Sequence, residues 1–325
     1  IGVSHLVFST QAGAGYGLSL VWLVVLISLL KYPAFRFSVD YASATGKSLV
    51  PAYAKIGKIA VAWLVIGFVA DMFAATAAVA LVAAGLFISV LNLPLTGPQA
   101  AVGLLIVSAL ILYKGQYSRA ERIIKVLVIM FSVLAVVAMV SAVPEIGAEG
   151  RAIFADISLT QANLVFIIAL AGWMPIPTNG AVLISAWVRE KRQASGDAFD
   201  AQAARSDLRI GFTLTIVLAL CFVILGTAVL FDTGRDVPTT AGGFATELLS
   251  IFTSSIGSWA YPVIAAAAIA VMWSTLVALM DVMPRVTDRL IGILAHRPDD
   301  APPRYATFLA VQVVGCSLIL LFLIS

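Results

Sequence analysis

The sequence predicts an all-α polytopic membrane protein with an inverted-repeat (5+5) transporter fold, in which the first and sixth helices are discontinuous. The first observation is composition: of 325 residues, 61% are hydrophobic and 11% are charged, whereas a soluble domain has about 25% charged residues. The second is the uncharged run 157–188, which is long enough to cross a bilayer but contains two prolines. The third is an alternation of basic and non-basic loops.

Each predicted span is an apolar stretch bounded by polar loops. Residues 1–14 are too short to span a membrane alone, so we expect them to form the second half of a helix whose first half is missing. The chain also stops inside an apolar run, so we expect a fragment lacking both ends, with a tenth span after residue 325. The remaining predicted spans are 17–37, 59–91, 98–113, 126–143, 157–188, 210–231, 258–280 and 305–325.

The loops between these spans alternate in charge. Lys and Arg accumulate on the cytoplasmic loops of membrane proteins. One set of loops holds 18 of the 20 Lys and Arg residues, and the other set holds 2. We therefore expect nine spans in a bacterial-type plasma (inner) membrane, with the missing N-terminus in the cytoplasm. The basic loops are 31–58, 114–125, 189–209 and 285–304, and the others are 91–97, 144–156 and 232–247.

The predicted spans divide into two repeats of opposite orientation. The first repeat covers 1–143, from the second half of span 1 to span 5, and the second covers 157–325, from span 6 to span 9. Spans 1 and 6 both carry polar or helix-breaking residues near the middle. Broken helices at equivalent places in inverted repeats are typical of secondary transporters, whose substrate site lies at the membrane midplane.

The break in the sixth span is the predicted substrate site. Pro175 and Pro177 each lack a backbone N–H and clash with the preceding turn, so a helix cannot continue through them. Lipid cannot satisfy the backbone groups that such a break frees, so these groups must face protein, water or a bound solute. The residues predicted to line the site from this side are Gly172, Met174, Thr178 and Asn179.

The N-terminal segment carries a resemblance to a known family. The stretch 11–22, Gln-Ala-Gly-Ala-Gly-Tyr-Gly-Leu-Ser-Leu-Val-Trp, resembles the end of the first span and the start of the second in Nramp proton-coupled divalent-metal transporters. The resemblance continues through Gly172-Trp173-Met174-Pro175 and covers the whole chain. Ser-His-Leu-Val at 4–7, followed by Ser-Thr-Gln-Ala-Gly-Ala at 9–14, resembles a divergent Nramp-related branch.

The resemblance implies which residues form the site, and the same comparison shows where this chain differs from the family pattern. Nramp transporters carry Asp-Pro-Gly-Asn at the first break, where the Asp and Asn bind the metal. This chain has Gly2-Val3-Ser4-His5 there, so the anionic ligand is absent and His5 stands in place of the Asn. Met174 corresponds to the family's thioether ligand, with Ile176 as a rival for that place. Asp71 falls where the family has a third-span Asp in its proton route, although Ala74 replaces the acidic residue one turn later.

The chemistry of the candidate ligands leaves alternatives open. Imidazole suits Mn, Fe, Co, Ni or Zn, so His5 is predicted to line the site together with Gly2. The alternative for His5 is a polar helix end bonded to a carbonyl. The soft sulfur of Met174 favours transition metals, or else the side chain fills a gap beside the kink.

The oxygen-bearing candidates also have structural alternatives. An intramembrane carboxylate is by default functional or paired, so Asp71 is predicted to handle protons. Its alternative is a structural bond to Thr76 or to an amide at the broken helix. Thr178 and Asn179 could offer oxygens to a cation, or could cap the second half-helix.

We expect a secondary transporter that moves a divalent metal cation (Mn, Fe or Mg) by alternating access, with proton coupling implied by the resemblance. The alternatives are a cation-coupled symporter of a small organic solute such as an amino acid, and a non-transporting receptor-like homologue. No enzyme motif is present, and we expect no resident cofactor. The expected partners are the lipid bilayer, the metal ion and protons. A nucleic acid is not expected, and the sequence implies no oligomer.

Overall fold

The computed structural model describes the backbone of residues 2–113, 117–150, 152–158, 160–177, 179–233, 241–297 and 304–324, and it leaves out the side chains of 117–125, 149, 197, 241 and 242. Within these residues all regular secondary structure is helical, apart from one isolated bridge between Gly17 and Phe154. This confirms the all-α prediction. Predicted Thr178 lies outside the described residues.

The helices follow the order of the predicted spans. The first predicted span is a π-helical turn, η1, that continues into α1, and a second π-helical turn, η3, joins α4 to α5. The bounds are η1 (Ser4–Ser9), α1 (Thr10–Tyr16), α2 (Val21–Thr45), α3 (Val50–Ile56), α4 (Lys58–Ala70), η3 (Asp71–Ala75), α5 (Thr76–Leu91), α6 (Gly97–Tyr113), α7 (Tyr117–Ala142), α8 (Gln161–Trp173), α9 (Gly180–Ser195), α10 (Ala201–Leu230), α11 (Ala241–Ile256), α12 (Tyr261–Leu294) and α13 (Tyr305–Phe322).

The helices have the length and surface of a membrane protein. In the described part of the chain, six helical stretches are long and apolar enough to cross a bilayer, and α6 and α8 are shorter apolar helices. Large hydrophobic side chains are exposed on many helices, such as Trp22, Ile59 and Trp63 at 61%, 88% and 75%. A soluble monomer rarely leaves this much apolar surface in water. The chain is therefore an integral, polytopic membrane protein, while the count of nine spans stays a prediction.

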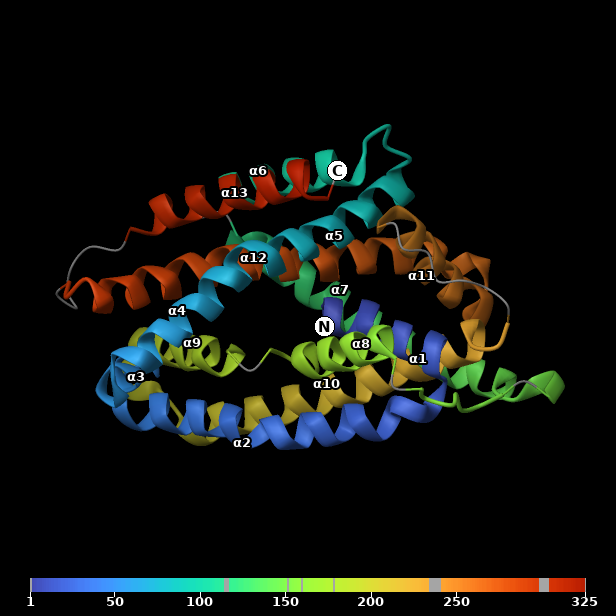
Figure 1. The fold of residues 1–325 in the computed structure, drawn as a ribbon, viewed down its shortest axis with the longest axis horizontal. Helices are drawn as coiled ribbons and strands as arrows, with labels where there is room; N and C mark the ends of the chain where they lie inside the picture. Colours follow the sequence, from blue (N-terminus) through green and yellow to red (C-terminus); the bar gives the residue numbers. More distant parts are fainter. Residues whose placement is uncertain are drawn as a thin grey trace.

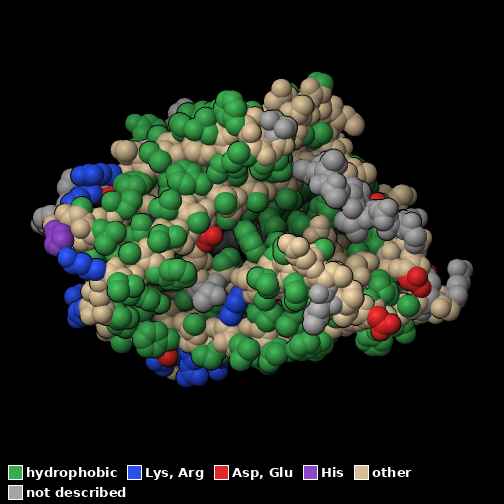
Figure 2. Space-filling view, viewed as in Figure 1, with side chains coloured by type: hydrophobic (Ala, Val, Ile, Leu, Met, Phe, Trp, Pro, Cys, Tyr) green, Lys and Arg blue, Asp and Glu red, His purple; other side chains and the backbone are tan. Residues whose placement is uncertain are grey.

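The long helices run along one axis of the molecule (Figure 1). The N-terminus and the gap between α8 and α9 both lie midway along this axis. Figure 2 shows basic side chains gathered at the end formed by α3, α9 and the last turns of α12, and acidic side chains at the opposite end. The surface between the two ends is mostly hydrophobic, as expected of a band that contacts lipid.

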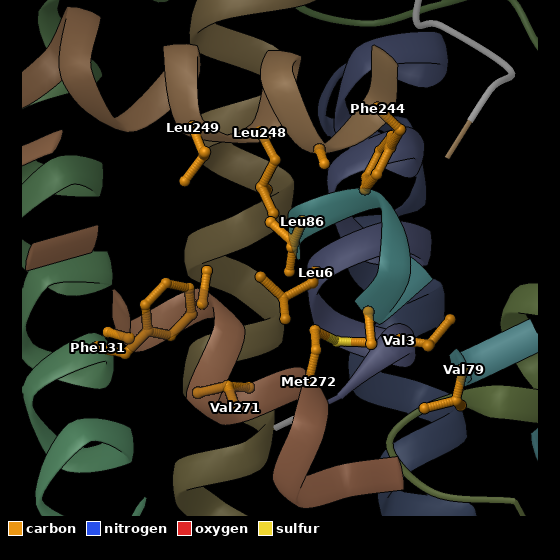
Figure 3. Close-up of a cluster of buried hydrophobic side chains, with 14 of the residues drawn as sticks. Val3, Leu6, Val79, Leu86, Phe131, Phe244, Leu248, Leu249, Val271 and Met272 are labelled. Atoms are coloured by element: carbon orange, nitrogen blue, oxygen red, sulfur yellow. The ribbon is translucent and has the colours of Figure 1, made fainter. Parts of the chain in front are cut away.

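The first helix packs its apolar face into the main core. Leu6 of η1 is fully buried and points toward Met272 of α12 and Leu86 of α5, beside Leu248 of α11 (Figure 3). The opposite face of η1 carries the hydroxyls of Ser4 and Ser9, whose bonds reach the break in the sixth helix. The core therefore fixes the orientation in which η1 presents its polar side chains.

Two glycines allow α1 to lie directly against α10. A Cβ on Gly226 would stand 2.3 Å from the carbonyl oxygen of Thr10, and a Cβ on Gly13 would stand 2.1 Å from that of Val223. Such distances are far inside van der Waals contact, so both positions require glycine. Small residues at helix crossings allow this close approach in membranes. The crossing holds the first helix near the middle of the molecule.

Some elements differ from the prediction. The first described helix is continuous from Ser4 to Tyr16, as expected of a half-helix that follows a break, and the break in span 1 itself stays a prediction. The second helix extends to Thr45 rather than ending near residue 37, and Asp40 forms ion pairs with Arg36 and Arg205 along this extension. The amphipathic helix α11 begins inside the predicted loop 232–247 and continues through residues that were assigned to no span. Hydropathy identifies long, uniformly apolar helices, and it misses an amphipathic helix such as α11.

Candidate functional site

The sixth helix is broken where its prolines predict. α8 ends at Trp173 and α9 begins at Gly180. The last carbonyls of a helix have no partner within it, and Pro175 and Pro177 cannot donate to any of them. The N–H of Met174 still bonds to the carbonyl of Leu170 at 2.9 Å. The carbonyls that follow Leu170 are therefore free to bind another donor.

The ammonium of Lys31 binds these free carbonyls. Its Nζ lies 2.8 Å from the carbonyl oxygens of both Ala171 and Gly172, 2.6 Å from that of Met174 and 3.2 Å from that of Ile176. An ammonium has three hydrogens, so four oxygens saturate it. The C-terminal end of a helix also carries partial negative charge. Together these oxygens form a site that binds a cation.

The sequence predicts Lys31 in the basic loop 31–58, at the cytoplasmic end of the second span. The structure does not place it at the end of that helix. It lies inside α2, which continues to Thr45. The residues that follow Lys31 also pack against the protein, because Tyr32 is partly buried and Phe35 is fully buried. A charge followed by more buried apolar residues indicates a lysine inside the membrane protein rather than at its edge.

The first helix contributes hydroxyl groups to the break. Ser4 Oγ donates to the carbonyl of Pro175 at 3.2 Å. Ser9 Oγ lies 3.1 Å from the carbonyl of Ser4 and 3.6 Å from the sulfur of Met174. The Met174 side chain is fully buried, so its sulfur sits between the two helices. The sequence offered Ser9 only as a contact for a small organic solute, and the structure places its hydroxyl beside that sulfur.

His5 is held by protein groups on both ring nitrogens. Its Nε2 lies 3.0 Å from the carbonyl oxygen of Thr215 on α10, and its Nδ1 lies 2.9 Å from Ser4 Oγ. A carbonyl only accepts, so Nε2 carries a hydrogen. The side chain is 1% exposed. In this conformation neither nitrogen is free to bind a metal.

Asp71 lies at the other side of the break. It is the first residue of η3 and is partly buried, and its carboxylate accepts a hydrogen bond from the side-chain amide of Asn179. Asn179 is the residue before α9, but its side chain does not cap that helix. A carboxylate near a helix N-terminus is favourable because that end carries partial positive charge. The pair therefore ties the third span to the start of α9.

The remaining predicted residues have backbone roles here. The carbonyl of Gly172 is one of the Lys31 partners. Gly2 is buried at the start of the first helix, and its carbonyl accepts from the N–H groups of His5 and Leu6 at 3.0 Å each. The described residues include no group of three or more His, Cys, Asp or Glu that could hold a metal. In this conformation the groups at the break that could contact an ion are the backbone oxygens, the Met174 sulfur and the hydroxyls of Ser4 and Ser9.

The chain matches a known protein family over nearly its whole length. The family model described as natural resistance-associated macrophage protein-like matches residues 1–323.

The chain belongs to the Nramp family.

Members of the Nramp family transport divalent metal ions, generally coupled to protons. The chain is also 32% identical over 308 residues to the uncharacterized protein PM0681 of Pasteurella multocida, which covers 93% of this chain and 70% of the relative. The name of that relative assigns it no activity. In this chain a lysine binds the sixth-helix carbonyls, and the start of the first described helix, Gly2-Val3-Ser4-His5, holds no carboxylate.

Proposed function

We propose that this Nramp protein is a secondary transporter that moves a divalent metal cation of the Mn/Fe type, or Mg²⁺, across the membrane by alternating access with proton coupling. The observation that carries the proposal is the set of backbone oxygens at the end of α8, which converge on one positive charge. Discontinuous helices supply cation sites of this kind in other transporters. The oxygens lie midway along the molecule, where a midplane site belongs (Figure 1).

The other groups at the break support the choice of a divalent metal. The sulfur of Met174 is a soft ligand and favours transition metals. The hydroxyls of Ser4 and Ser9 are close enough to the break to contact an ion or its water. His5 is a second proposed ligand, which would first have to release Ser4 or Thr215. Gly2, Gly172 and Thr178 are proposed to line the site.

Asp71 is the proposed proton-handling group. It is an acidic residue inside a long apolar helix, bonded to the start of α9 through Asn179. Loss of its charge would weaken the hydrogen bond to Asn179, so protonation of Asp71 would loosen the connection between the third span and the start of α9. Proton binding and movement of the half-helix are coupled in this proposal.

We place the site between two inverted repeats, 1–143 and 157–325, within a (5+5) fold of the LeuT and Nramp type. The basic end of the molecule in Figure 2 is assigned to the cytoplasm of a bacterial-type inner membrane. We keep the nine predicted spans in this orientation, so that the first described helix runs from the cytoplasmic side outward. The second half-helix, α9, then leads from the site to the cytoplasm.

Uptake of Mn²⁺ by the full-length protein tests the proposal. The protein is reconstituted in liposomes that contain a metal-sensitive dye, and Mg²⁺ is added outside as competitor. Saturable Mn²⁺ entry that resists Mg²⁺ is expected for a site that uses the Met174 sulfur, whereas Mg²⁺ suppression indicates an oxygen-lined site for a hydrated ion. Protein-free liposomes are the control. No entry of either ion would contradict the proposal.

A second candidate function follows from the same carbonyls. A small organic solute with a primary ammonium, such as an amino acid, can make the hydrogen bonds that Lys31 Nζ makes. Cation-coupled symporters of such solutes use the same type of fold. Metal-independent uptake of a labelled amino acid, with no Mn²⁺ entry, would favour this candidate.

A further inference from the structure

We infer that Lys31 is a tethered competitor of the transported cation: its ammonium occupies the cation position at the α8–α9 break, and an ion binds there only when the ammonium leaves. This inference rests on the proposed function, and it adds a residue that controls access to the site. The ammonium arrives from α2, a separate helix, and meets carbonyls on both sides of Pro175.

Lys31 is coordinated by carbonyl oxygens, as a bound metal cation would be, and its ammonium is not paired with a carboxylate in the described contacts. The four oxygens within 3.2 Å of Nζ are all backbone carbonyls. A lysine inside a membrane protein can pair with a carboxylate or with backbone carbonyls. The described carboxylate at the break, Asp71, instead accepts from Asn179. Lys31 therefore hydrogen-bonds the carbonyls of the broken helix and offsets their partial negative charge, which is the role that a bound cation would have.

Charge prevents the ammonium and a divalent ion from sharing these oxygens. Unit charges a few ångströms apart repel strongly in a low dielectric. An ion at the carbonyls of Ala171, Gly172 and Met174 would lie within the contact distance of the lysine nitrogen. Asp71 contributes one negative charge and cannot balance both cations. Binding of the ion and binding of the ammonium are therefore mutually exclusive.

The distances between Lys31 Nζ and the carbonyl oxygens also indicate that the ammonium and a divalent ion cannot occupy the site together. Nζ–O distances of 2.6 to 3.2 Å suit an ammonium, whereas Mg²⁺ requires oxygens at about 2.0–2.1 Å. The carbonyls must close around a divalent ion after the ammonium has left. The four-carbon stem of lysine is flexible, so the head group can leave without movement of α2. The lysine thus keeps the freed carbonyls paired while the site holds no ion.

The test compares the full-length wild type with Lys31→Met and with a matched control, Lys47→Met, which removes the charge of an exposed lysine. Mn²⁺ binding is measured by isothermal titration calorimetry. Melting temperature is measured alone, with Mn²⁺ and with methylammonium. If the ammonium occupies the position about nine-tenths of the time, its removal raises the Mn²⁺ affinity about tenfold.

Lys31→Met is also expected to melt several degrees lower without cations, because four carbonyls lose their partner, and to recover with Mn²⁺ or methylammonium. Lys47→Met is expected to behave as the wild type. An unchanged or weaker Mn²⁺ affinity, with a melting temperature that no cation alters, would overturn the inference.

The experiment also separates this inference from the proposed function. Recovery with methylammonium alone, together with no Mn²⁺ uptake by the wild type, would keep Lys31 in the cation position and would reject the divalent metal as substrate. Mn²⁺ uptake by the wild type, with no response of Lys31→Met to any cation, would reject the inference alone. If Lys31→Met does not fold, Lys31→Gln supplies the comparison, because its neutral amide still donates hydrogen bonds.

Discussion

At the scale of single residues, the break in the sixth helix presents opposite charges to its two half-helices. The carbonyl end of α8 holds the Lys31 ammonium. The amide end of α9 lies beside the Asp71 carboxylate, to which Asn179 is bonded. Each charge therefore faces the pole of the helix dipole that stabilises it. Removal of either charge should change the binding of ions at this site.

Asp71→Asn removes the negative charge while it keeps the size of the side chain. We expect the variant to lose the stimulation of Mn²⁺ uptake by an inward proton gradient, because an amide cannot take up the proton. Uptake in liposomes with and without the gradient measures this. Glu190→Gln, at an exposed position on α9, is the control. Gradient-driven uptake that persists in Asp71→Asn would exclude Asp71 from the coupling.

Met174→Leu tests whether the Met174 sulfur is a ligand of the transported metal. The two side chains are similar in volume, so the substitution should cost less than about 1.5 kcal/mol of stability. We expect the preference for Mn²⁺ over Mg²⁺ to fall about tenfold, which corresponds to the loss of roughly 1.4 kcal/mol of selective binding. Competition assays on the reconstituted protein measure the ratio. Met283→Leu, which changes a buried methionine inside α12, should leave the ratio unchanged. An equal loss in both variants would contradict a ligand role for Met174.

At the scale of elements, the break in the sixth helix could be predicted from the sequence, but the Lys31 ammonium that binds the carbonyls at the break could not. Pro175 and Pro177 determine the break locally, so the sequence alone predicts it. The carbonyls that Lys31 reaches depend on how α2 packs beside α8, and one sequence carries no record of that contact. A charge near the end of an apolar run was therefore interpreted as a membrane boundary.

The polar face of η1 was also only partly predictable. His5 was expected at the site from the resemblance, and it lies within hydrogen-bonding distance of Ser4, which bonds to Pro175. Its bond to the Thr215 carbonyl depends on the crossing with α10. The bond between Asn179 and Asp71 joins residues 108 positions apart in the chain. The sequence offered an amide at the broken helix as a structural partner of Asp71, but it did not identify which amide.

The α1–α10 crossing gives a prediction at this scale. Gly226→Ala would place a Cβ against the Thr10 carbonyl, and overpacking of this kind costs about 1–3 kcal/mol. Gly211→Ala is the matched control on the same helix, because nothing lies within 4 Å of its new Cβ. We expect Gly226→Ala to lower the melting temperature and Gly211→Ala to leave it equal or higher. Equal melting temperatures for both variants would contradict the close crossing.

At the scale of the whole molecule, charge is distributed along the axis of the long helices. Basic side chains gather at one end, acidic side chains gather at the other, and a hydrophobic band lies between them (Figure 2). Lys31 and Asp71 are located at the break, away from these ends. This pattern supports a molecule that crosses the membrane along its long axis with the basic end in the cytoplasm.

Cysteine accessibility tests that orientation. The two native cysteines, Cys221 and Cys316, are free and buried, so each new cysteine can be labelled selectively. A membrane-impermeant maleimide added to intact cells should label Glu145→Cys and should label Lys58→Cys only after permeabilisation. Both positions are exposed. The reverse pattern would place the basic end outside the cell.

The most direct test of the central claim is the location of Mn²⁺ in crystals of the full-length protein, from its anomalous scattering. The account predicts an anomalous peak among the carbonyls of Ala171, Gly172 and Met174, with the Lys31 side chain displaced from them. A structure in which Mn²⁺ binds elsewhere, while Lys31 stays on these carbonyls, would contradict it.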